Sequence, residues 1–541
     1  MHAGYTTRVR YRRVHRYCLA ALSLSSFVMS PAVAQKPASN LRAAAEPARL
    51  RRIGTIDSRF QSYNVEMIEV TGGAFWKPYG STASALLTSN DAQLGIDTYQ
   101  FEYRPPIDLA NARLRLLARA LGPAYVRVAG TWANSIYFAD SETRPAKTPD
   151  GFKGVLTRQQ WRGVIAFAKA TDAKIMTSFA ISSGVRDSRG AWTPKMAERW
   201  LAYTHAIGGT ISAAEFMNEP SIAGISGAPK GYDAAAYGRD FKSFRVFAKK
   251  AAPGMLILGP GSATETPEPW GMPPSIPGSI PSADLLASGG SDVDAFSYHH
   301  YGAASVRCEA SHLPQTRLED ALSEQWLART GVTHAYYAAL RDRYAPGKPI
   351  WMTEGADAAC GGNPWGGSFI DSFRYLDQLG LLAKQGVQVS IHNTLAAGSY
   401  SLLDPEDFSP KANYWAALLW HRLMGTTVLD AGIPLQPGLH VYAHCQPDRV
   451  GGVALLIINN DADRTASITL PGKRFRYTLS VTDTPSVGVK LNGQLLQLDA
   501  RDRLPAIVGL AERSPVASFA PRTITFLAIP EAGNPACKPH L

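Results

Sequence analysis

Apolar runs alternate with segments of helical spacing through most of the chain. The first strand is expected to end near Val70, and seven more are expected at Tyr125–Ala129, Lys174–Ala180, Ile211–Phe216, Met255–Leu258, Val293–Tyr298, Pro349–Met352 and Val387–His392. Helices are expected between them, including Leu109–Leu121, Arg158–Ala170, Tyr232–Lys250, Leu318–Tyr344 and Phe369–Lys384. This alternation predicts an α/β fold, a (β/α)8 TIM barrel. A doubly wound sheet is the alternative, but no Gly-x-Gly-x-x-Gly follows the first predicted strand.

The pattern changes after Gly425. Short β-branched runs such as Val453–Ile458 and Thr523–Ile529 are separated by Pro, Gly, Asn and Asp, which predicts a C-terminal antiparallel β-sandwich domain. We therefore expect a barrel over residues 59–425 and a sandwich over residues 426–541. The Ala/Pro-rich segment 35–58 is expected to be flexible or to add a strand to the sandwich.

The first residues have the three parts of a secretory signal peptide. Five arginines precede an apolar run from Tyr17 to Met29, and Ala32-Val33-Ala34 offers a cleavage site before Gln35. The apolar run is too short to cross a membrane, and no other anchor is apparent. We therefore expect residues 1–34 to be removed and the protein to be exported, to the periplasm or to the medium.

Removal of this segment changes the charge and the cysteine count. It holds five Arg and no Asp or Glu, so the formal net charge falls from +11 to +6 (11 − 5). A mildly basic chain suits an anionic polysaccharide, and no Lys/Arg-rich run interleaved with aromatic residues indicates nucleic-acid binding. Four cysteines remain after Cys18 is lost, which permits two disulfides, and no His or Cys spacing indicates a metal site.

Two glutamates carry the candidate chemistry. The apolar stretches Ala-Glu-Phe-Met-Asn218-Glu219-Pro220 and Ile-Trp-Met-Thr-Glu354 end the fourth and seventh predicted strands. In a barrel these strands lie on opposite sides of the ring, so the two carboxylates can face one another across its mouth. Such a pair is the minimal equipment for retaining glycoside hydrolysis, with Glu219 as acid/base and Glu354 as nucleophile. A lone glutamate at a strand end is usually only solvated.

Asn218 stands beside the first glutamate. It is expected to bond a sugar 2-hydroxyl or, alternatively, to cap the turn after the strand.

At these positions the chain resembles glycoside hydrolase family 79, the heparanases and β-glucuronidases. The resemblance runs from about residue 60 to the C-terminus. It rests on Asn218-Glu219-Pro220, on Glu354 with Cys360-Gly361-Gly362 after it, and on further stretches at Gly122–Thr131, Ser297–Tyr301, Tyr375–Leu382, Ala397–Asp404 and Asn413–Trp420.

The resemblance implies further site residues. The N–H groups of Gly361 and Gly362 and the hydroxyl of Tyr400 would hold the carboxylate of glucuronic acid, because consecutive N–H groups form an anion-binding nest. Tyr301 would orient Glu354, with His299 and Thr131 as further contacts. His299 and His300 lie on opposite faces of their strand, and His299 shares the face of Tyr301. Glu66 and Glu69 end the first predicted strand, where the family contacts sugar, and the choice between them stays open.

The resemblance also includes the pair Cys445 and Cys537. A second disulfide, between Cys308 and Cys360, would brace the rim of the cleft and is a hypothesis from their positions.

Together these features predict a secreted, monomeric, retaining β-glucuronidase of heparanase type that needs no metal or organic cofactor. The choice between exo and endo action stays open. The loop after the fifth predicted strand lacks the basic cluster that grips sulfates, and Glu265 and Glu268 there would repel them. A related hydrolase for a neutral sugar and a non-catalytic polysaccharide-binding protein are the alternatives.

Overall fold

A computed structural model describes residues 40–81, 98–263, 265, 278–311, 313–481 and 488–538. The predicted signal peptide and Glu268 lie outside these residues. None of the helices in the described ranges is both long and apolar enough to cross a membrane.

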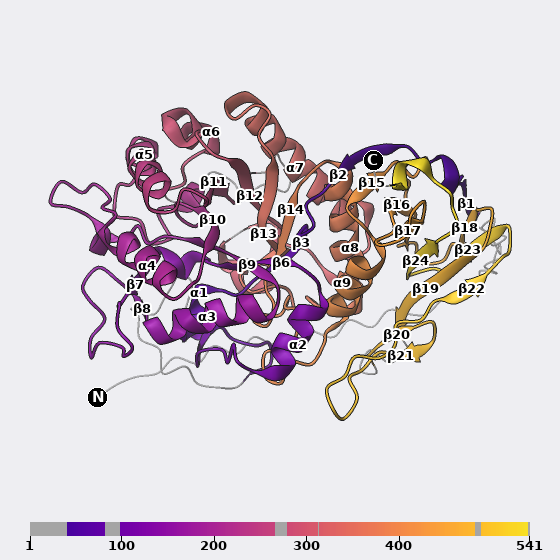
Figure 1. Ribbon diagram of the computed structural model, residues 1–541, viewed down its shortest axis with the longest axis horizontal. Helices are drawn as coiled ribbons and strands as arrows, with labels where there is room; N and C mark the ends of the chain where they lie inside the picture. The colour runs from indigo at the N-terminus through magenta and orange to yellow at the C-terminus, as the bar shows by residue number, and fades with distance from the viewer. Residues whose placement is uncertain are drawn as a thin grey trace, which may run out of the picture. The chain divides into compact units, whose positions relative to one another are not determined.

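Eight parallel strands close into a barrel (Figure 1). In chain order they are β3 (Gln61–Asn64), β6 (Ala124–Val128), β9 (Ala173–Ser178), β10 (Ile211–Glu215), β11 (Leu256–Ser262), β12 (Ala295–Ala304), β13 (Ile350–Ala359) and β14 (Val389–His392). Each strand pairs with the next, and β14 pairs with β3. The predicted fold class is therefore confirmed.

The prediction for the first barrel strand was wrong. The strand β3 ends at Asn64, and Val70 lies in the short helix α1 (Met67–Thr71). The Glu69 carboxylate accepts a hydrogen bond of 2.7 Å from the N–H of Glu66, the residue that caps this helix. That local bond ends the extended chain, and an alternation of apolar and acidic residues does not reveal it. Glu66 and Glu69 thus begin a helix rather than end a strand.

Helices cover the outside of the barrel (Figure 1). They are α2 (Ala112–Ala120), α3 (Arg158–Ala170), α4 (Lys195–Ala206), α5 (Ala234–Ala251), α6 (Ser282–Leu285), α7 (Glu324–Tyr344), α8 (Phe369–Lys384) and α9 (Ala412–Leu423). The predicted bounds of α3 and α8 match the structure. Helix α7 begins six residues later than expected, because the Ser323 hydroxyl caps it by accepting a hydrogen bond from the N–H of Trp326.

Two further strand pairs flank the barrel mouth. They are the antiparallel pair β4 (Gly73–Trp76) and β5 (Phe101–Arg104), and the parallel pair β7 (Ile136–Phe138) and β8 (Gly154–Leu156).

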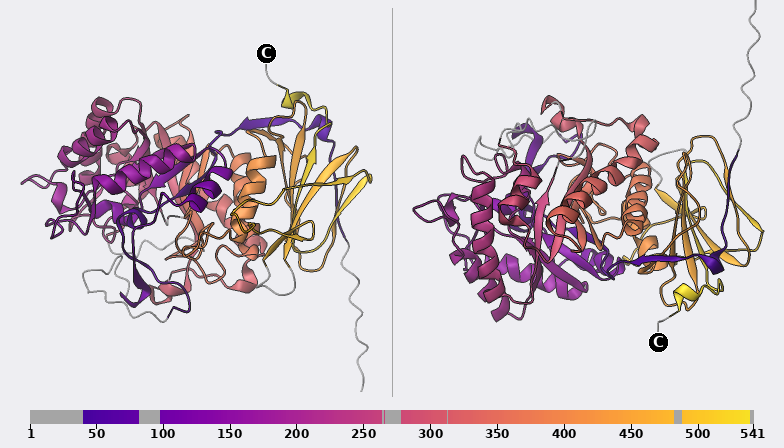
Figure 2. Two further views of the ribbon diagram at one scale, coloured as in Figure 1. Left: turned by 60° about the horizontal axis from the view of Figure 1, so that its bottom comes forward. Right: turned by 90° about the horizontal axis from the view of Figure 1, so that it is seen from above.

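The C-terminal strands form two sheets (Figure 2). The larger contains β2 (Arg52–Thr55), β15 (Thr427–Leu429), β16 (His440–Cys445), β17 (Val453–Asn459), β24 (Thr523–Ile529), β19 (Arg474–Val481), β20 (Val489–Leu491), β21 (Gln494–Leu495) and β22 (Leu510–Glu512). The smaller contains β1 (Leu41–Ala44), β18 (Ala466–Thr469) and β23 (Val516–Phe519). Side chains of both sheets share one apolar core.

The segment before the barrel contributes a strand to each sheet. Strand β1 pairs in parallel with β18, and β2 pairs antiparallel with β15. The disulfide Cys445–Cys537 joins β16 to the C-terminal segment.

The barrel interior is filled in layers. The lower layer is apolar and contains Tyr125, Met176, Ala213, Leu258, Ala295, Trp351, Val389 and Ile391. Two residues further along three of these strands, on the same face, stand Arg127, Glu215 and Ser297. The strands therefore carry an apolar layer below and a polar layer above, near their C-terminal ends.

Candidate active site

Arg127 is the centre of the polar layer. Its side chain is fully buried, and its guanidinium donates to Glu354 Oε2 at 2.6 Å, to Glu215 Oε2 at 3.0 Å and to Asn218 Oδ1 at 2.7 Å. A planar guanidinium can hold several acceptors in fixed directions, which a lysine cannot. Arg127 thus fixes residues from two opposite sides of the barrel relative to one another.

Glu215 anchors this arrangement from below. Its other oxygen accepts hydrogen bonds from Ser297 Oγ at 2.8 Å and from Thr353 Oγ1 at 2.7 Å. Burial raises the pKa of Glu215, but Arg127 and His299 outweigh burial and hold that pKa far below its ordinary value. Glu215 is therefore a permanent buried anion.

A β-bulge on β13 turns Glu354 into the site. Tyr298 pairs with Met352 but His299 pairs with Glu354, so Thr353 is the extra residue. The Thr353 hydroxyl bonds Glu215 inside the barrel, and Glu354 also faces inward, where Arg127 binds it. In a regular strand these two neighbours would point to opposite faces.

Glu354 is held in its ionised form. Its second oxygen accepts a hydrogen bond of 2.6 Å from the Tyr301 hydroxyl. Burial raises the pKa of Glu354, but His299, Arg127 and this hydroxyl together lower that pKa below its ordinary value.

Glu219 is in the opposite electrostatic situation. It follows Asn218 in a left-handed conformation with φ of 49°, and its Oε1 lies 3.0 Å from His299 Nδ1. Burial raises the pKa of Glu219, and the negative charge of Glu354 adds to this, against the opposing effect of His299. Ligand-type atoms of Glu219, His299 and Glu354 all lie within 4.8 Å of one another, so the two carboxyl groups are close.

These three residues also have the spacing of a metal-binding group. The surrounding charges do not favour a cation. Burial lowers the pKa of His299, but Glu354, Glu215 and Glu219 outweigh it and raise that pKa to about 9. The Arg127 guanidinium already binds Glu354. The imidazole and the guanidinium are both basic groups beside these carboxylates, and their positive charge would repel a metal ion.

The other candidate site residues are also largely buried. Asn218 is fixed by Asn134, whose Oδ1 accepts from the Asn218 N–H at 2.9 Å. Asn218 Nδ2 is buried and has no partner within the described residues. Thr131 is buried at the start of the 3-10 turn that follows β6. His300 lies on the opposite face from His299, with Nε2 at 3.3 Å from the Thr330 hydroxyl, outside the site.

Glu66 and Glu69 have different surroundings in the structure. A Cβ atom at Gly130 would lie 1.6 Å from Glu66 Oε2, so the end of β6 approaches this carboxyl closely. Burial and the charge of Glu354 raise the pKa of Glu66 well above its ordinary value. Glu69 instead faces its own helix terminus and Arg104. Glu66 is thus the one of the two whose charge interacts with Glu354.

A tight turn follows β13 at Cys360–Gly362. All three residues have positive φ, at 60°, 78° and 83°. A Cβ atom at Gly361 would lie 2.6 Å from the Trp76 ring, and one at Gly362 would lie 2.8 Å from the Tyr400 ring. Glycine is therefore required at both positions. The disulfide Cys308–Cys360 ties the turn to the segment after β12, as hypothesised from the sequence.

Tyr400 and Tyr301 meet next to this turn. Asn393 Nδ2 donates to the Tyr301 hydroxyl at 2.9 Å and to the Tyr400 hydroxyl at 3.1 Å. The Asn393 Oδ1 in turn accepts from Asn64 Nδ2 at 3.0 Å. The two tyrosine hydroxyls are thus held together by Asn393, the residue after β14, which Asn64 of β3 holds in turn.

Comparisons with known proteins agree with this geometry. Residues 106–265 match the model of the glycosyl hydrolase family 79 N-terminal domain. The chain is 29% identical over 385 residues to heparanase-like protein 1 of Arabidopsis thaliana, covering 67% of each chain. It is 26% identical over 498 residues to heparanase of Mus musculus, covering 80% of this chain and 87% of the other. Over 171 residues it is 34% identical to baicalin-β-D-glucuronidase of Scutellaria baicalensis, covering 30% and 32%.

These matches show similarity to glycoside hydrolase family 79 over most of the chain. The matched relatives are glycoside hydrolases, and the chain is accordingly a hydrolase. Among solved structures, the GH51 α-L-arabinofuranosidase of Thermotoga petrophila superposes with a TM-score of 0.60 at 13% identity, covering 90% of this chain and 99% of that chain. This similarity concerns the fold alone.

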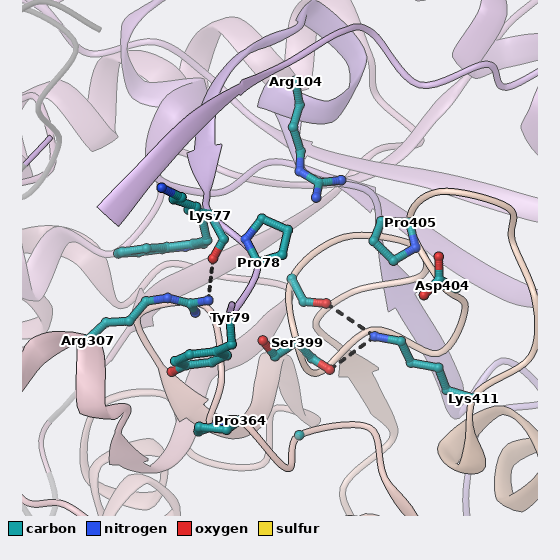
Figure 3. A pocket seen from close by; sticks show the side chains of 13 residues that line it. Lys77, Pro78, Tyr79, Arg104, Arg307, Pro364, Ser399, Asp404, Pro405 and Lys411 are labelled. Carbon is teal, nitrogen blue, oxygen red and sulfur yellow. Dashed lines mark hydrogen bonds between the residues drawn. The ribbon is translucent and has the colours of Figure 1, made fainter. Parts of the chain in front are cut away.

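A cationic cavity adjoins the turn Cys360–Gly362 (Figure 3). Its volume is about 250 Å³, and its lining among the described residues includes Lys77, Arg104, Arg307 and Lys411 but one acidic residue, Asp404. The four cations come from four separate segments. No local pattern reveals this cluster, because no two of them are neighbours in the chain.

Sequence reasoning also missed the central residues of the site. Arg127 and Glu215 each interrupt an apolar strand at a position that faces the barrel interior. A charged residue in the middle of a buried strand is rarely left without a partner. That signal was present in both strands and would have pointed to an ion pair between them.

Proposed function

We propose that this hydrolase is a retaining β-glucuronidase of heparanase type. The observation that carries the proposal is the pair Glu219 and Glu354: one oxygen of each lies within 4.8 Å of one oxygen of the other, and their pKa values are moved in opposite directions. Retaining glycosidases have carboxyl groups about 5–5.5 Å apart, whereas inverting enzymes need about 6.5–9.5 Å to admit a water molecule. The short separation favours double displacement.

In the first step Glu354 attacks the anomeric carbon while Glu219 donates its proton to the departing oxygen. The C–O bond to the leaving group breaks as the bond to Glu354 forms. In the second step Glu219, now ionised, takes a proton from water, and that water displaces Glu354. His299 lies 3.0 Å from Glu219 and stabilises the ionised state that forms between the two steps. Asn218 Nδ2 is available for the sugar 2-hydroxyl.

The proposed sugar is β-linked glucuronic acid. Its carboxylate would accept hydrogen bonds from the N–H groups of Gly361 and Gly362 and from the Tyr400 hydroxyl. These N–H groups are buried, and neither has an acceptor among the described residues. The glucuronidase name of the Scutellaria relative supports the same substrate class. Thr131 and Glu66 are proposed as further sugar contacts.

We further propose that the enzyme acts as an exported monomer on glucuronate-containing oligo- or polysaccharides, including heparan-type chains. Two disulfides support an oxidising compartment outside the cytoplasm, consistent with the predicted signal peptide. The sandwich is proposed to support the barrel: His440 of β16 bonds Asp377 of α8 at 2.5 Å and Glu324 of α7 at 2.9 Å.

The proposal is tested by hydrolysis of p-nitrophenyl β-glucuronide and p-nitrophenyl β-glucoside. The expected result is a strong preference for the glucuronide, with β-glucuronic acid as the first product seen by ¹H NMR. Glu219→Gln and Glu354→Gln should both abolish turnover. Azide should rescue a Glu219→Ala variant and give the β-glycosyl azide, because azide then attacks the glycosyl-enzyme without a general base.

Other outcomes separate the alternatives. Cleavage of the glucoside alone would indicate a neutral-sugar hydrolase and remove the carboxylate nest from the proposal. Full turnover by Glu354→Gln would rule out this nucleophile. Inactivity on both aryl substrates and on heparan-type chains would favour a polysaccharide-binding protein.

A further inference from the structure

The turn Cys360–Gly362 is held by its carbonyl oxygens. Cys360 O accepts hydrogen bonds from Ser305 Oγ at 2.9 Å and from Arg307 Nη1 at 3.3 Å. Gly361 O accepts from the same Arg307 Nη1 at 3.3 Å and from the Ser399 N–H at 3.0 Å. Gly362 O accepts from the Tyr79 hydroxyl at 2.8 Å. Three carbonyls in succession are thus bonded from the side of the cationic cavity.

Fixing these carbonyls also fixes the N–H groups of the turn. A peptide unit is planar and trans, so its C=O and its N–H point in opposite directions. The N–H of Gly361 belongs to the same peptide unit as Cys360 O, and the N–H of Gly362 belongs to that of Gly361 O. One guanidinium nitrogen therefore sets the direction of both N–H groups that we propose for the glucuronate carboxylate.

Arg307 is itself held rigidly. Its guanidinium carbon lies 3.8 Å from the centre of the Tyr79 ring, and Nη2 donates to Lys77 O (Figure 3). Its hydrogen-bond partners in the described residues are backbone carbonyls, and no described carboxylate forms an ion pair with it. Among the described residues the charge of Asp357 acts on Arg307 without forming an ion pair, so the positive charge is only partly balanced. It polarises the two peptide units, which makes their N–H groups stronger donors to an anion.

We propose that Arg307, seated on Tyr79, is the positioning residue that gives the Gly361–Gly362 turn its specificity for an anionic sugar. This inference rests on the proposed glucuronidase function. Arg307 acts through the backbone of the turn and does not touch the substrate. The disulfide joins Cys308, the residue after Arg307, to Cys360, the first residue of the turn, so the segment after β12 and the turn move as one unit.

The inference differs from two simpler roles for Arg307. If Arg307 bound the substrate directly from the cavity, its charge alone would suffice and the bonds to the turn would be incidental. If Arg307 only stabilised the loop, its loss would lower the melting temperature without separating charged from neutral substrates.

The test uses the full-length enzyme and steady-state kinetics with p-nitrophenyl β-glucuronide and β-glucoside. Arg307→Met is expected to raise KM for the glucuronide about tenfold to a hundredfold, the loss expected for weakened hydrogen bonds to a charged group. KM for the glucoside, and kcat for both, should change several-fold less. Arg307→Lys should behave like Arg307→Met, because an ammonium lacks the planar fork. Tyr79→Phe keeps the ring under the guanidinium and loses only the bond to Gly362 O, whose peptide unit carries the N–H of Asn363, so it should change the glucuronide KM far less.

Arg104→Met is the matched control. Arg104 lines the same cavity, but within the described residues it donates no hydrogen bond to the turn. The Arg104→Met variant should therefore keep the wild-type ratio of glucuronide KM to glucoside KM. Equal effects of Arg104→Met and Arg307→Met would refute positioning and indicate a general electrostatic effect. Wild-type KM in Arg307→Lys would refute the role of the fork.

Folding is monitored by the melting temperature. If Arg307→Met does not fold, Arg307→Lys decides the question, because it keeps the charge and loses the planar fork that bonds the two carbonyls. An unchanged glucuronide KM in folded Arg307→Lys would then overturn the inference. A wild-type enzyme without preference for the glucuronide would instead overturn the proposed function.

Discussion

Substitution of Arg127 by Met should affect stability and catalysis together. Arg127 is fully buried and binds two carboxylates, Glu215 at 3.0 Å and Glu354 at 2.6 Å. In this buried cluster the basic groups Arg127 and His299 lie beside the carboxylates Glu215 and Glu354. The substitution removes one of the two basic groups and leaves the buried carboxylates undercompensated.

The magnitude follows from that imbalance. Removing one partner of a buried ion pair costs about 3–5 kcal/mol, because the other charge stays buried and unpaired. Arg127 serves two carboxylates, so we expect the free energy of unfolding to fall by at least about 3 kcal/mol. The pKa of Glu354 should rise as well, since Arg127 is one of the groups that lower it. A rise of one unit corresponds to about 1.4 kcal/mol less stabilisation of the ionised nucleophile.

Chemical denaturation and the pH dependence of kcat/KM measure the two effects. Arg127→Met should shift the acidic limb of the kcat/KM profile to higher pH. The double variant Arg127→Met/Glu215→Gln is the control: it removes one charge of each sign and should be more stable than the single variant, although still impaired in catalysis. A loss of less than about 1 kcal/mol in Arg127→Met, or a double variant less stable than the single one, would refute the reasoning.

Three further predictions concern other parts of the molecule. The kcat/KM profile of the wild type should be bell-shaped. Activity falls at acidic pH because Glu354, whose pKa is lowered, takes up a proton, and it falls at higher pH because Glu219, whose pKa is raised, loses one. A flat profile from pH 4 to pH 8 would contradict this assignment. Tyr301→Phe removes a 2.6 Å hydrogen bond to Glu354, so kcat should fall about tenfold to a hundredfold and the acidic limb should move to higher pH; an unmoved limb would show that Tyr301 does not tune the nucleophile. Replacing both Cys445 and Cys537 by Ser opens a link across 92 residues and should cost about 4 kcal/mol of stability with kcat unchanged in the folded enzyme, whereas an equal melting temperature would show that the bond is dispensable.

The regular elements of the barrel were predictable from local pattern. The bounds of α3 and α8 follow from helical spacing, although α3 buries one face whereas α8 is buried nearly all round. The first strand was not predictable in the same way. The sequence from Val65 to Val70 is compatible with a strand or with a helix. A hydrogen bond between the side chain of Glu69 and the backbone of Glu66 favours the helix.

The same distinction between local pattern and tertiary contact applies to the residues of the site. Glu219 and Glu354 were found from the sequence because each glutamate ends an apolar run. The inward direction of Glu354 depends on the bulge at Thr353, which arises only when β12 and β13 are paired. Arg127 and Arg307 were assigned no role, and the choice between Glu66 and Glu69 stayed open, because the partners of these residues lie far away in the chain.

The sequence by itself determined the alternation of elements, the sandwich after Gly425 and the two glutamates, because these depend on periodicity and on residue type at strand ends. The tertiary structure decided which groups meet. Glu219 and Glu354 are chemically identical side chains, and burial beside one another, with Arg127 and His299 between them, moves their pKa values apart. Electrostatic differences of this kind arise from distances between residues remote in the chain, and only the closed barrel fixes those distances.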